Sequence, residues 1–176
     1  MQLREEIRRI QLELGITTVF VTHDQAEALS VADRVGVMRS GRLEQIASPD
    51  DLYERPATAF VAEFVGTMNR IPAVLADDAV HVLGAHRPVS GATPPPGPVT
   101  ALVRPEALLV QADPGGVGRV ITRTFSGAVT RVLVGLPDGV EVRVDVASAV
   151  SAELTPGTPV TVTPAERPVL VVPVEA

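Results

Sequence analysis

Residues 17–22 are the stretch that most constrains how this chain can fold. The run Thr17-Thr18-Val19-Phe20-Val21-Thr22 is β-branched and apolar on both faces, as is typical of a buried strand in a parallel sheet. It ends abruptly at His23-Asp24-Gln25, after which an amphipathic helix is predicted to run to about Ala32. Ligands of open α/β sheets bind beyond the carboxyl ends of the strands, so His23 stands where a ligand would lie.

Capping and turn signals predict the elements around this stretch. Gly15 suits the left-handed residue that follows a helix end, and Thr22 with Gln25 matches a capping box for the helix after His23. The remaining signals predict a helix over residues 1–15, a hairpin around Arg39-Ser40-Gly41, a helix that starts at Ser48-Pro49 and stops before Pro56, and a helix over residues 58–65 that ends at Gly66.

From Pro72 onward the composition changes and helical periodicity disappears. Fourteen of the sixteen prolines lie at or after this position, and residues 90–98 predict an extended loop. Valines alternate with charged residues over 140–146, which predicts a half-buried strand in a hairpin around Pro137-Asp138-Gly139 with residues 129–136 as partner. Further short strands are predicted at 99–104, 107–111, 117–125, 160–163 and 169–174, so we expect a small barrel or sandwich.

Composition excludes several functions. The net charge is -6, and from Pro72 on the chain has seven Arg, ten Asp or Glu and one aromatic residue, Phe125, so a nucleic-acid partner is not expected. All fifteen basic residues are Arg; a Walker-type phosphate-binding loop needs a Lys, and the sequence has none. No apolar run is long enough to span a bilayer and no signal peptide is visible, so a soluble, cytoplasmic protein is expected.

His23 is the first candidate site residue. An isolated histidine at a helix start is ordinarily a partly exposed surface residue without a ligand. Its position between an apolar strand and a helix N-terminus favours a binding role, because imidazole can donate a hydrogen bond to a phosphate that the helix dipole also attracts. We interpret Asp24 and Glu27 as cap and first-turn carboxylates.

Two other groups of polar residues invite a functional interpretation. Asp77, Asp78, His81 and His86 contain the side-chain types of a metal cluster, but polar residues of turns and strand edges are the preferred interpretation, and no metal site is predicted. Arg104 and Glu106 are interpreted as an ion pair that fixes the start of a strand, with a regulatory contact as the alternative.

Several motifs that occur in order resemble the importer ATPases of the ATP-binding-cassette family, in particular the polyamine, ferric-iron and sugar uptake group. The matching segments are residues 12–28, 33–42, 48–56 and 60–66, together with Asn69. Downstream, Val103-Arg104-Pro105-Glu106 and Phe125-Ser126-Gly127 resemble the transport-associated OB-type (TOBE) domain of that group.

The resemblance implies a fold class and a role. Residues 1–71 would be the C-terminal part of the ATPase domain, an α/β remnant, and residues 72–176 an all-β, OB-like regulatory domain. His23 would be the switch histidine that contacts the γ-phosphate of ATP in the full-length subunit, which also uses Mg. Two such subunits would pair on the cytoplasmic side of a membrane permease.

The resemblance also implies that most of the nucleotide site is missing. The family's phosphate-binding loop, Q-loop, signature motif, Walker B aspartate and catalytic glutamate would all precede residue 1. With no complete catalytic set and no Lys, this chain alone is expected not to bind or hydrolyse ATP. The alternative is a stand-alone regulatory module that associates with a permease or binds a small anion. A different enzyme has little support, because no nucleophile–base pair is apparent.

Overall fold

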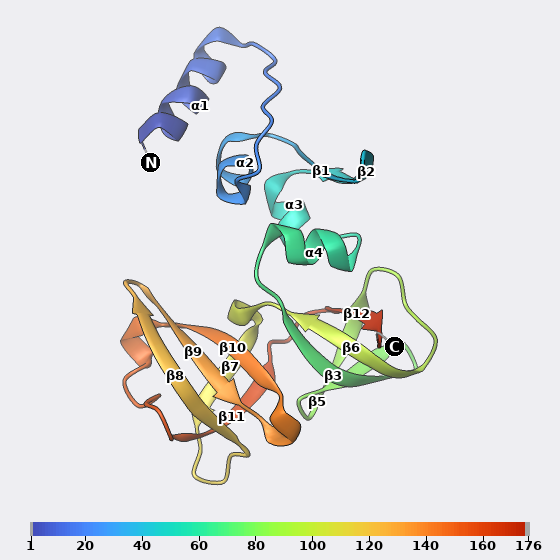
Figure 1. Cartoon of the computed structure of the whole chain (residues 1–176), viewed down its shortest axis with the longest axis vertical. Helices are drawn as coiled ribbons and strands as arrows, with labels where there is room; N and C mark the ends of the chain where they lie inside the picture. The colour runs from blue at the N-terminus through green and yellow to red at the C-terminus, as the bar shows by residue number, and fades with distance from the viewer. Residues whose placement is uncertain (1, 175–176) are drawn as a thin grey trace. The chain divides into compact units, whose positions relative to one another are not determined.

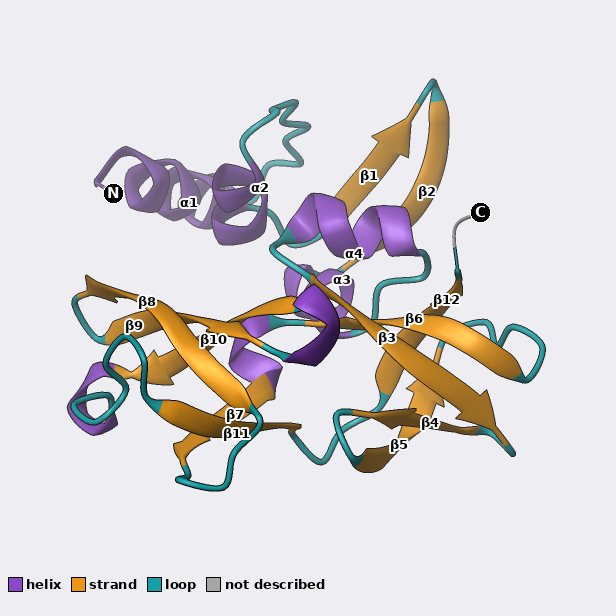
Figure 2. Ribbon diagram, turned by 60° about the horizontal axis from the view of Figure 1, so that its bottom comes forward, coloured by secondary structure: helices purple, strands orange, loops and turns teal. Residues whose placement is uncertain are grey.

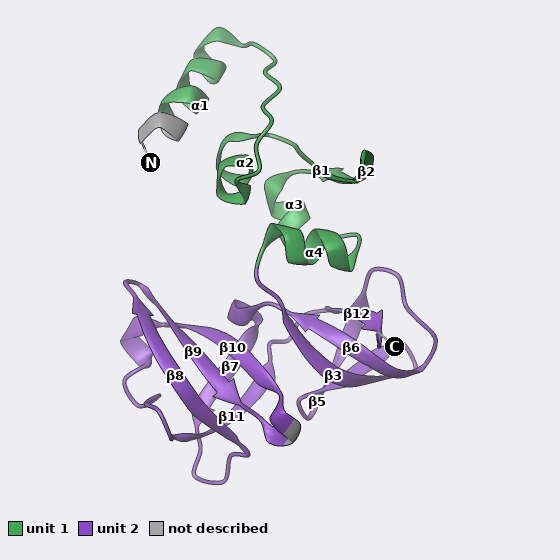
Figure 3. Cartoon of the chain, viewed as in Figure 1, with its two compact units in different colours: residues 1–66 green, residues 67–176 purple. Residues whose placement is uncertain are grey.

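Two compact units make up the chain, unit 1 over residues 1–66 and unit 2 over residues 67–176 (Figure 3). The computed structural model describes residues 2–174, without the side chains of residues 2–5 and 138. Met1, whose status as a native start the sequence leaves open, lies outside the described residues. The composition changes at Pro72, but strand β3 (Asn69–Ala76) already belongs to unit 2.

Unit 1 is made of short elements (Figure 1), and most of their ends follow the predicted signals, except for the start of the helix after His23. Ser48 caps the third helix by accepting a hydrogen bond from the Asp51 N–H, and Thr58 caps the fourth through the Val61 N–H. Gly15 has a φ of 60°, as predicted for the residue after a helix. The elements are α1 (Gln2–Leu14), α2 (Gln25–Val31), β1 (Val35–Arg39), β2 (Arg42–Ala47), α3 (Pro49–Glu54) and α4 (Ala59–Val65).

The predicted strand over residues 17–22 is wrong for this structure. These residues are extended but pair with no strand, and the described part of unit 1 has one sheet, the antiparallel pair β1–β2. Val19 is 87% exposed and Val21 is 90% exposed. A strand that is apolar on both faces needs neighbours on both edges and cover on both faces, and none of the described residues supplies them.

The buried part of unit 1 lies where the β1–β2 hairpin packs against α3 and α4 (Figure 2). Its core consists of Val37, Leu52, Val61 and Val65. The Arg39 guanidinium lies 4.7 Å from the centroid of the Phe60 ring, which supports the hairpin from the side of α4. This core is small because only the faces of two short helices and one face of a hairpin meet there.

Unit 2 contains a closed five-stranded barrel, which agrees with the predicted OB-like domain. The strand order is β12-β5-β4-β3-β6, and all pairs are antiparallel except β12 with β5. Besides β3, the barrel strands are β4 (Ala79–Val82), β5 (Ala85–Ser90), β6 (Gly97–Val103) and β12 (Val169–Pro173).

A second, five-stranded antiparallel sheet completes unit 2, with the order β10-β9-β8-β11-β7. Val142 and Val144 of the predicted hairpin are fully buried, which confirms the alternation found in the sequence. The strands are β7 (Leu108–Ala112), β8 (Gly118–Ser126), β9 (Val129–Gly135), β10 (Glu141–Ala147) and β11 (Pro159–Pro164), with 3₁₀ turns η1 (Pro105–Ala107), η2 (Pro137–Gly139) and η3 (Ser148–Val150).

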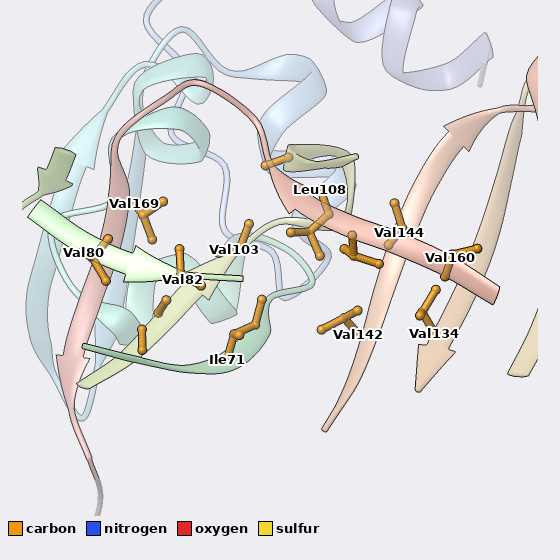
Figure 4. Packing of buried hydrophobic residues seen from close by; sticks show 14 of the residues in the cluster. Ile71, Val80, Val82, Val103, Leu108, Val134, Val142, Val144, Val160 and Val169 are labelled. Carbon is orange, nitrogen blue, oxygen red and sulfur yellow. The ribbon is translucent and has the colours of Figure 1, made fainter. Parts of the chain in front are cut away.

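One hydrophobic core joins the barrel to this sheet. In Figure 4, Leu108 lies between the barrel residues Val82 and Val103 and the sheet residues Val144 and Val160. Asn69 adds a polar link, because its side-chain amide donates to the Arg143 carbonyl (2.8 Å) and accepts from the Arg143 N–H (2.7 Å). Barrel and sheet therefore form a single folded body.

Candidate functional site

His23 lies in the bend between the extended segment and α2, and it is exposed. The predicted capping box at Thr22 is displaced by two residues, since Asp24 is the N-cap and its carboxylate accepts from the Glu27 N–H at 3.0 Å. Asp24 and Glu27 thus have the cap and first-turn positions that the sequence indicated.

A local hydrogen-bond network holds the residues on both sides of His23. The Thr22 hydroxyl accepts from the Asp24 N–H at 2.9 Å and donates to the Glu27 carboxylate at 2.9 Å. Thr22, Asp24 and Glu27 therefore use their polar side chains to fix the start of α2. The same constraints leave the imidazole of His23 on the surface, where it can act as a hydrogen-bond donor or acceptor.

An ion pair connects the two helices that flank the extended segment. Arg8 of α1 donates to the Asp33 carboxylate just after α2, with Nη1 3.1 Å from Oδ2. This hydrogen bond, with the positive charge of Arg8, lowers the pKa of Asp33 below its ordinary value. The segment that leads to His23 is thus a loop between two helices that this ion pair holds together.

The polar residues of unit 2 fall into separate places. Asp77 and Asp78 form the turn between β3 and β4 and have φ values of 49° and 63°. His81 of β4 and His86 of β5 are direct cross-strand partners. Among the described residues, no group of three or more His, Cys, Asp or Glu side chains is arranged to hold a metal ion.

Arg104 has a structural position. It is 6% exposed at the junction of β6 and η1, while Glu106 is exposed. The Nη1 atom of Arg104 is buried within unit 2, and the ion pair with Glu106 that the sequence suggested stays a prediction.

A buried hydroxyl network in the five-stranded sheet was not foreseen from the sequence. The Thr130 and Ser148 hydroxyls are 2.8 Å apart, and Arg123 donates to the Ser151 hydroxyl at 2.9 Å. Thr130 and Ser151 are fully buried. No spacing rule joins these residues, because β8, β9 and the η3 turn bring them together only in the folded unit.

None of the helices within residues 2–174 is both long and apolar enough to cross a membrane. The described residues include an exposed histidine, His23, in unit 1, and unit 2 has a hydrophobic core of its own.

Comparison with known proteins places these observations in context. The TOBE domain family matches residues 101–172. The chain is 46% identical over 130 residues to the sulfate/thiosulfate import ATP-binding protein CysA of Xanthomonas campestris pv. campestris, which covers 74% of this chain and 38% of the relative. It is 40% identical over 156 residues to the spermidine/putrescine import ATP-binding protein PotA of Marinobacter nauticus, covering 80% of this chain and 41% of the relative.

A third relative has another named solute. The sn-glycerol-3-phosphate import ATP-binding protein UgpC of Ruegeria pomeroyi is 45% identical over 122 residues, covering 68% of this chain and 34% of the relative. The chain thus spans about two fifths of the length of the curated relatives it matches. Among solved structures, the cytoplasmic molybdate-binding protein ModG aligns with 60% of this chain and 95% of its own at a TM-score of 0.45 and 17% identity, which is too distant to support a conclusion.

Proposed function

Because this chain is related to the ATP-binding subunits of ATP-binding-cassette importers and carries a TOBE domain, we propose that it supplies the C-terminal part of such a subunit. In this role unit 1 is the remnant of the ATPase domain and unit 2 is the regulatory domain. Two subunits pair on the cytoplasmic face of a permease, and ATP hydrolysis with Mg drives uptake of a solute. The relatives are named for different solutes, namely sulfate or thiosulfate, spermidine or putrescine, and sn-glycerol-3-phosphate.

The exposure of His23 is the observation that carries this proposal. Its neighbours Thr22 and Asp24 are engaged in capping α2, whereas the imidazole faces outward at the start of the helix. An imidazole in that position can donate a hydrogen bond to the γ-phosphate of ATP, once the rest of a nucleotide site lies opposite. His23 would therefore sense the phosphate, and the chain contains no complete catalytic set of its own.

A nucleotide titration tests whether the chain alone lacks a complete catalytic set. We expect the chain alone to show no Mg-dependent binding of a fluorescent ATP analogue in the micromolar range and no ATPase activity. The full-length Xanthomonas relative serves as the positive control under the same conditions. Micromolar, Mg-dependent binding to the chain alone would contradict the proposal.

A chimera tests whether His23 senses the phosphate. The C-terminal part of the Xanthomonas relative is replaced by this chain, and ATPase activity of the chimera is measured. We expect activity in the chimera, loss of at least about a hundredfold with His23→Ala, and little change with the control Gln25→Ala, which alters an exposed residue two positions away. Equal activity of the His23→Ala and Gln25→Ala chimeras would contradict a sensing role.

A second candidate is a stand-alone regulatory module that binds a permease or a small anion. The self-contained core of unit 2 favours it, because that unit needs no contribution from unit 1 to bury its apolar residues. An inactive chimera, together with nucleotide-independent binding of the chain to a permease, would support this candidate over the first.

A further inference from the structure

Two of the three histidines in the chain lie opposite each other on the hairpin formed by β4 and β5. His81 pairs with His86 across the strands, and both side chains are exposed. Their ring centroids are 4.9 Å apart, with an angle of 40° between the ring planes. The two imidazoles are therefore close neighbours on the outer face of the barrel.

The tight turn explains why they are so close. Val82 pairs with Ala85, so Leu83 and Gly84 form a two-residue turn, with φ values of 50° and 77°. In such a hairpin the pair flanking the turn exchanges hydrogen bonds and the next pair does not. His81 and His86 are this next pair, whose side chains approach each other more closely than those of a hydrogen-bonded pair.

The spacing of the rings fits shared coordination of one metal ion. Metal–imidazole bonds of about 2.0–2.1 Å place two rings on one ion, at right or tetrahedral angles, with their centroids about 4.5–5.2 Å apart. The observed separation of 4.9 Å falls within that range.

The surroundings leave this pair available to a cation. Arg87, the adjacent basic residue, donates to the carbonyls of Ala165 (2.8 Å), Pro164 (2.7 Å) and His86 (2.8 Å), so its guanidinium is engaged with backbone carbonyls and not with the imidazoles. The residue opposite His81 on β3 is Val74, which is apolar. The sequence has no Cys, so no thiolate competes for a soft metal.

We propose that His81 and His86 form a two-histidine binding site for a late first-row divalent transition metal ion, with water as the remaining ligands. Neutral imidazole favours Cu²⁺, Ni²⁺ and Zn²⁺, with Cu²⁺ bound most tightly in the usual order of affinities. Mg²⁺ and Ca²⁺ prefer oxygen ligands and are rejected. A bound ion joins β4 to β5 and stabilises the hairpin that these two barrel strands form.

Calorimetric titration of the tag-free chain with Cu²⁺ and Ni²⁺ tests this proposal, with Mg²⁺ as the negative control. We expect one ion per chain. Both His81→Ala and His86→Ala are expected to weaken binding at least about tenfold. Loss of a residue that only hydrogen-bonds to a metal ligand already weakens metal binding by about this factor. His23→Ala is the matched control, since it removes the third histidine from the other unit, and it is expected to leave the affinity unchanged.

Thermal unfolding supplies an independent readout. Ni²⁺ should raise the melting temperature of the unaltered chain and of His23→Ala, and should not raise that of His81→Ala. Circular dichroism checks that the variants keep their β structure. Binding that survives in both hairpin variants, binding lost only in His23→Ala, or one ion shared by two chains would each overturn the proposal.

Discussion

Units 1 and 2 differ in how completely they bury their own apolar residues. The core cluster of unit 2 contains 20 buried residues, whereas that of unit 1 contains four. In unit 1, Leu12, Val19 and Val21 remain 67%, 87% and 90% exposed. These side chains would be buried only if another surface covered them.

The difference shows what each unit requires of the rest of a protein. Unit 2 closes a barrel and packs a second sheet on it, so every strand has a partner and one face of each is covered. Unit 1 has well-formed caps and turns but an uncovered apolar segment between α1 and α2. The caps and turns of unit 1 therefore form from its own residues, whereas burial of its apolar segment between α1 and α2 requires a further surface.

Separating the units is the strongest test of this comparison. Residues 67–176 expressed alone should unfold cooperatively, because their core is internal, while residues 1–66 alone should bind a hydrophobic dye and aggregate. Circular dichroism melting and dye fluorescence distinguish the two outcomes. A cooperative transition in the isolated unit 1 would remove the contrast.

The same substitution in the two units should have unequal effects. Leu108→Ala in unit 2 is expected to cost about 2–5 kcal/mol, because the side chain is 1% exposed and its removal leaves a cavity. Leu12→Ala in unit 1 should change stability by no more than about 0.5 kcal/mol, since that side chain is 67% exposed. Urea unfolding of the whole chain measures both, and equal losses would contradict the burial argument.

Asn69 tests whether barrel and sheet of unit 2 behave as one body. Asn69→Ala removes both hydrogen bonds to the Arg143 backbone and leaves that N–H and carbonyl without this partner, at a cost of about 1–3 kcal/mol. Gln111→Ala, at an exposed amide on β7, is the control and should be nearly neutral. Hydrogen exchange should quicken in β10 of the Asn69 variant. Unchanged exchange there would mean that this link is dispensable.

The smallest effects concern one surface carboxylate in each unit. The Thr161 hydroxyl and the Gly115 N–H lower the pKa of Asp113, while the Ser48 hydroxyl and Arg55 lower the pKa of Asp51, both from an ordinary value of 3.8. A lowered pKa stabilises the fold above about pH 3.8, and this contribution is lost as the pH falls through the folded-state pKa.

The hydrogen bonds from Thr161 to Asp113 and from Ser48 to Asp51 can be tested separately. Thr161→Val should raise the pKa of Asp113 and leave that of Asp51 unchanged, and Ser48→Ala should do the reverse. Carboxyl carbon chemical shifts followed against pH report each value. A common shift of both carboxyls in either variant would show that the two units are not electrostatically independent.

Strands β3, β4 and β5 show where interpretation of the sequence reached its limit. Pro72 and Pro88 lie inside β3 and β5, although proline ordinarily argues against a strand. The first of the turns between these strands uses Asp77 and Asp78 at positive φ, where glycine is the usual signal, and the second uses Leu83 before Gly84. The valine alternation of β10, by contrast, predicted a hairpin that the structure confirms.

The sequence was enough to single out His23 as a candidate site residue, but not to predict the three-dimensional arrangement around it. His23 follows from its place between an apolar run and a helix start, and its exposure agrees with a surface role. His81 and His86 stood out in the sequence as side-chain types of a metal cluster, but their pairing did not, because strands β4 and β5 were not predicted.

The sequence by itself determined the cap at Ser48, the turn at Ser40-Gly41 and the alternating strand over residues 140–146, because these depend on hydrogen bonds and side-chain spacing between residues close in the chain. Only the tertiary structure decided which strands close the barrel, where Leu170 of β12 pairs with Leu102 of β6. It also decided that the run at residues 17–22 remains extended and exposed. A strand exists only when a second strand accepts its hydrogen bonds, and that partner is set by the fold and not by the strand's own residues.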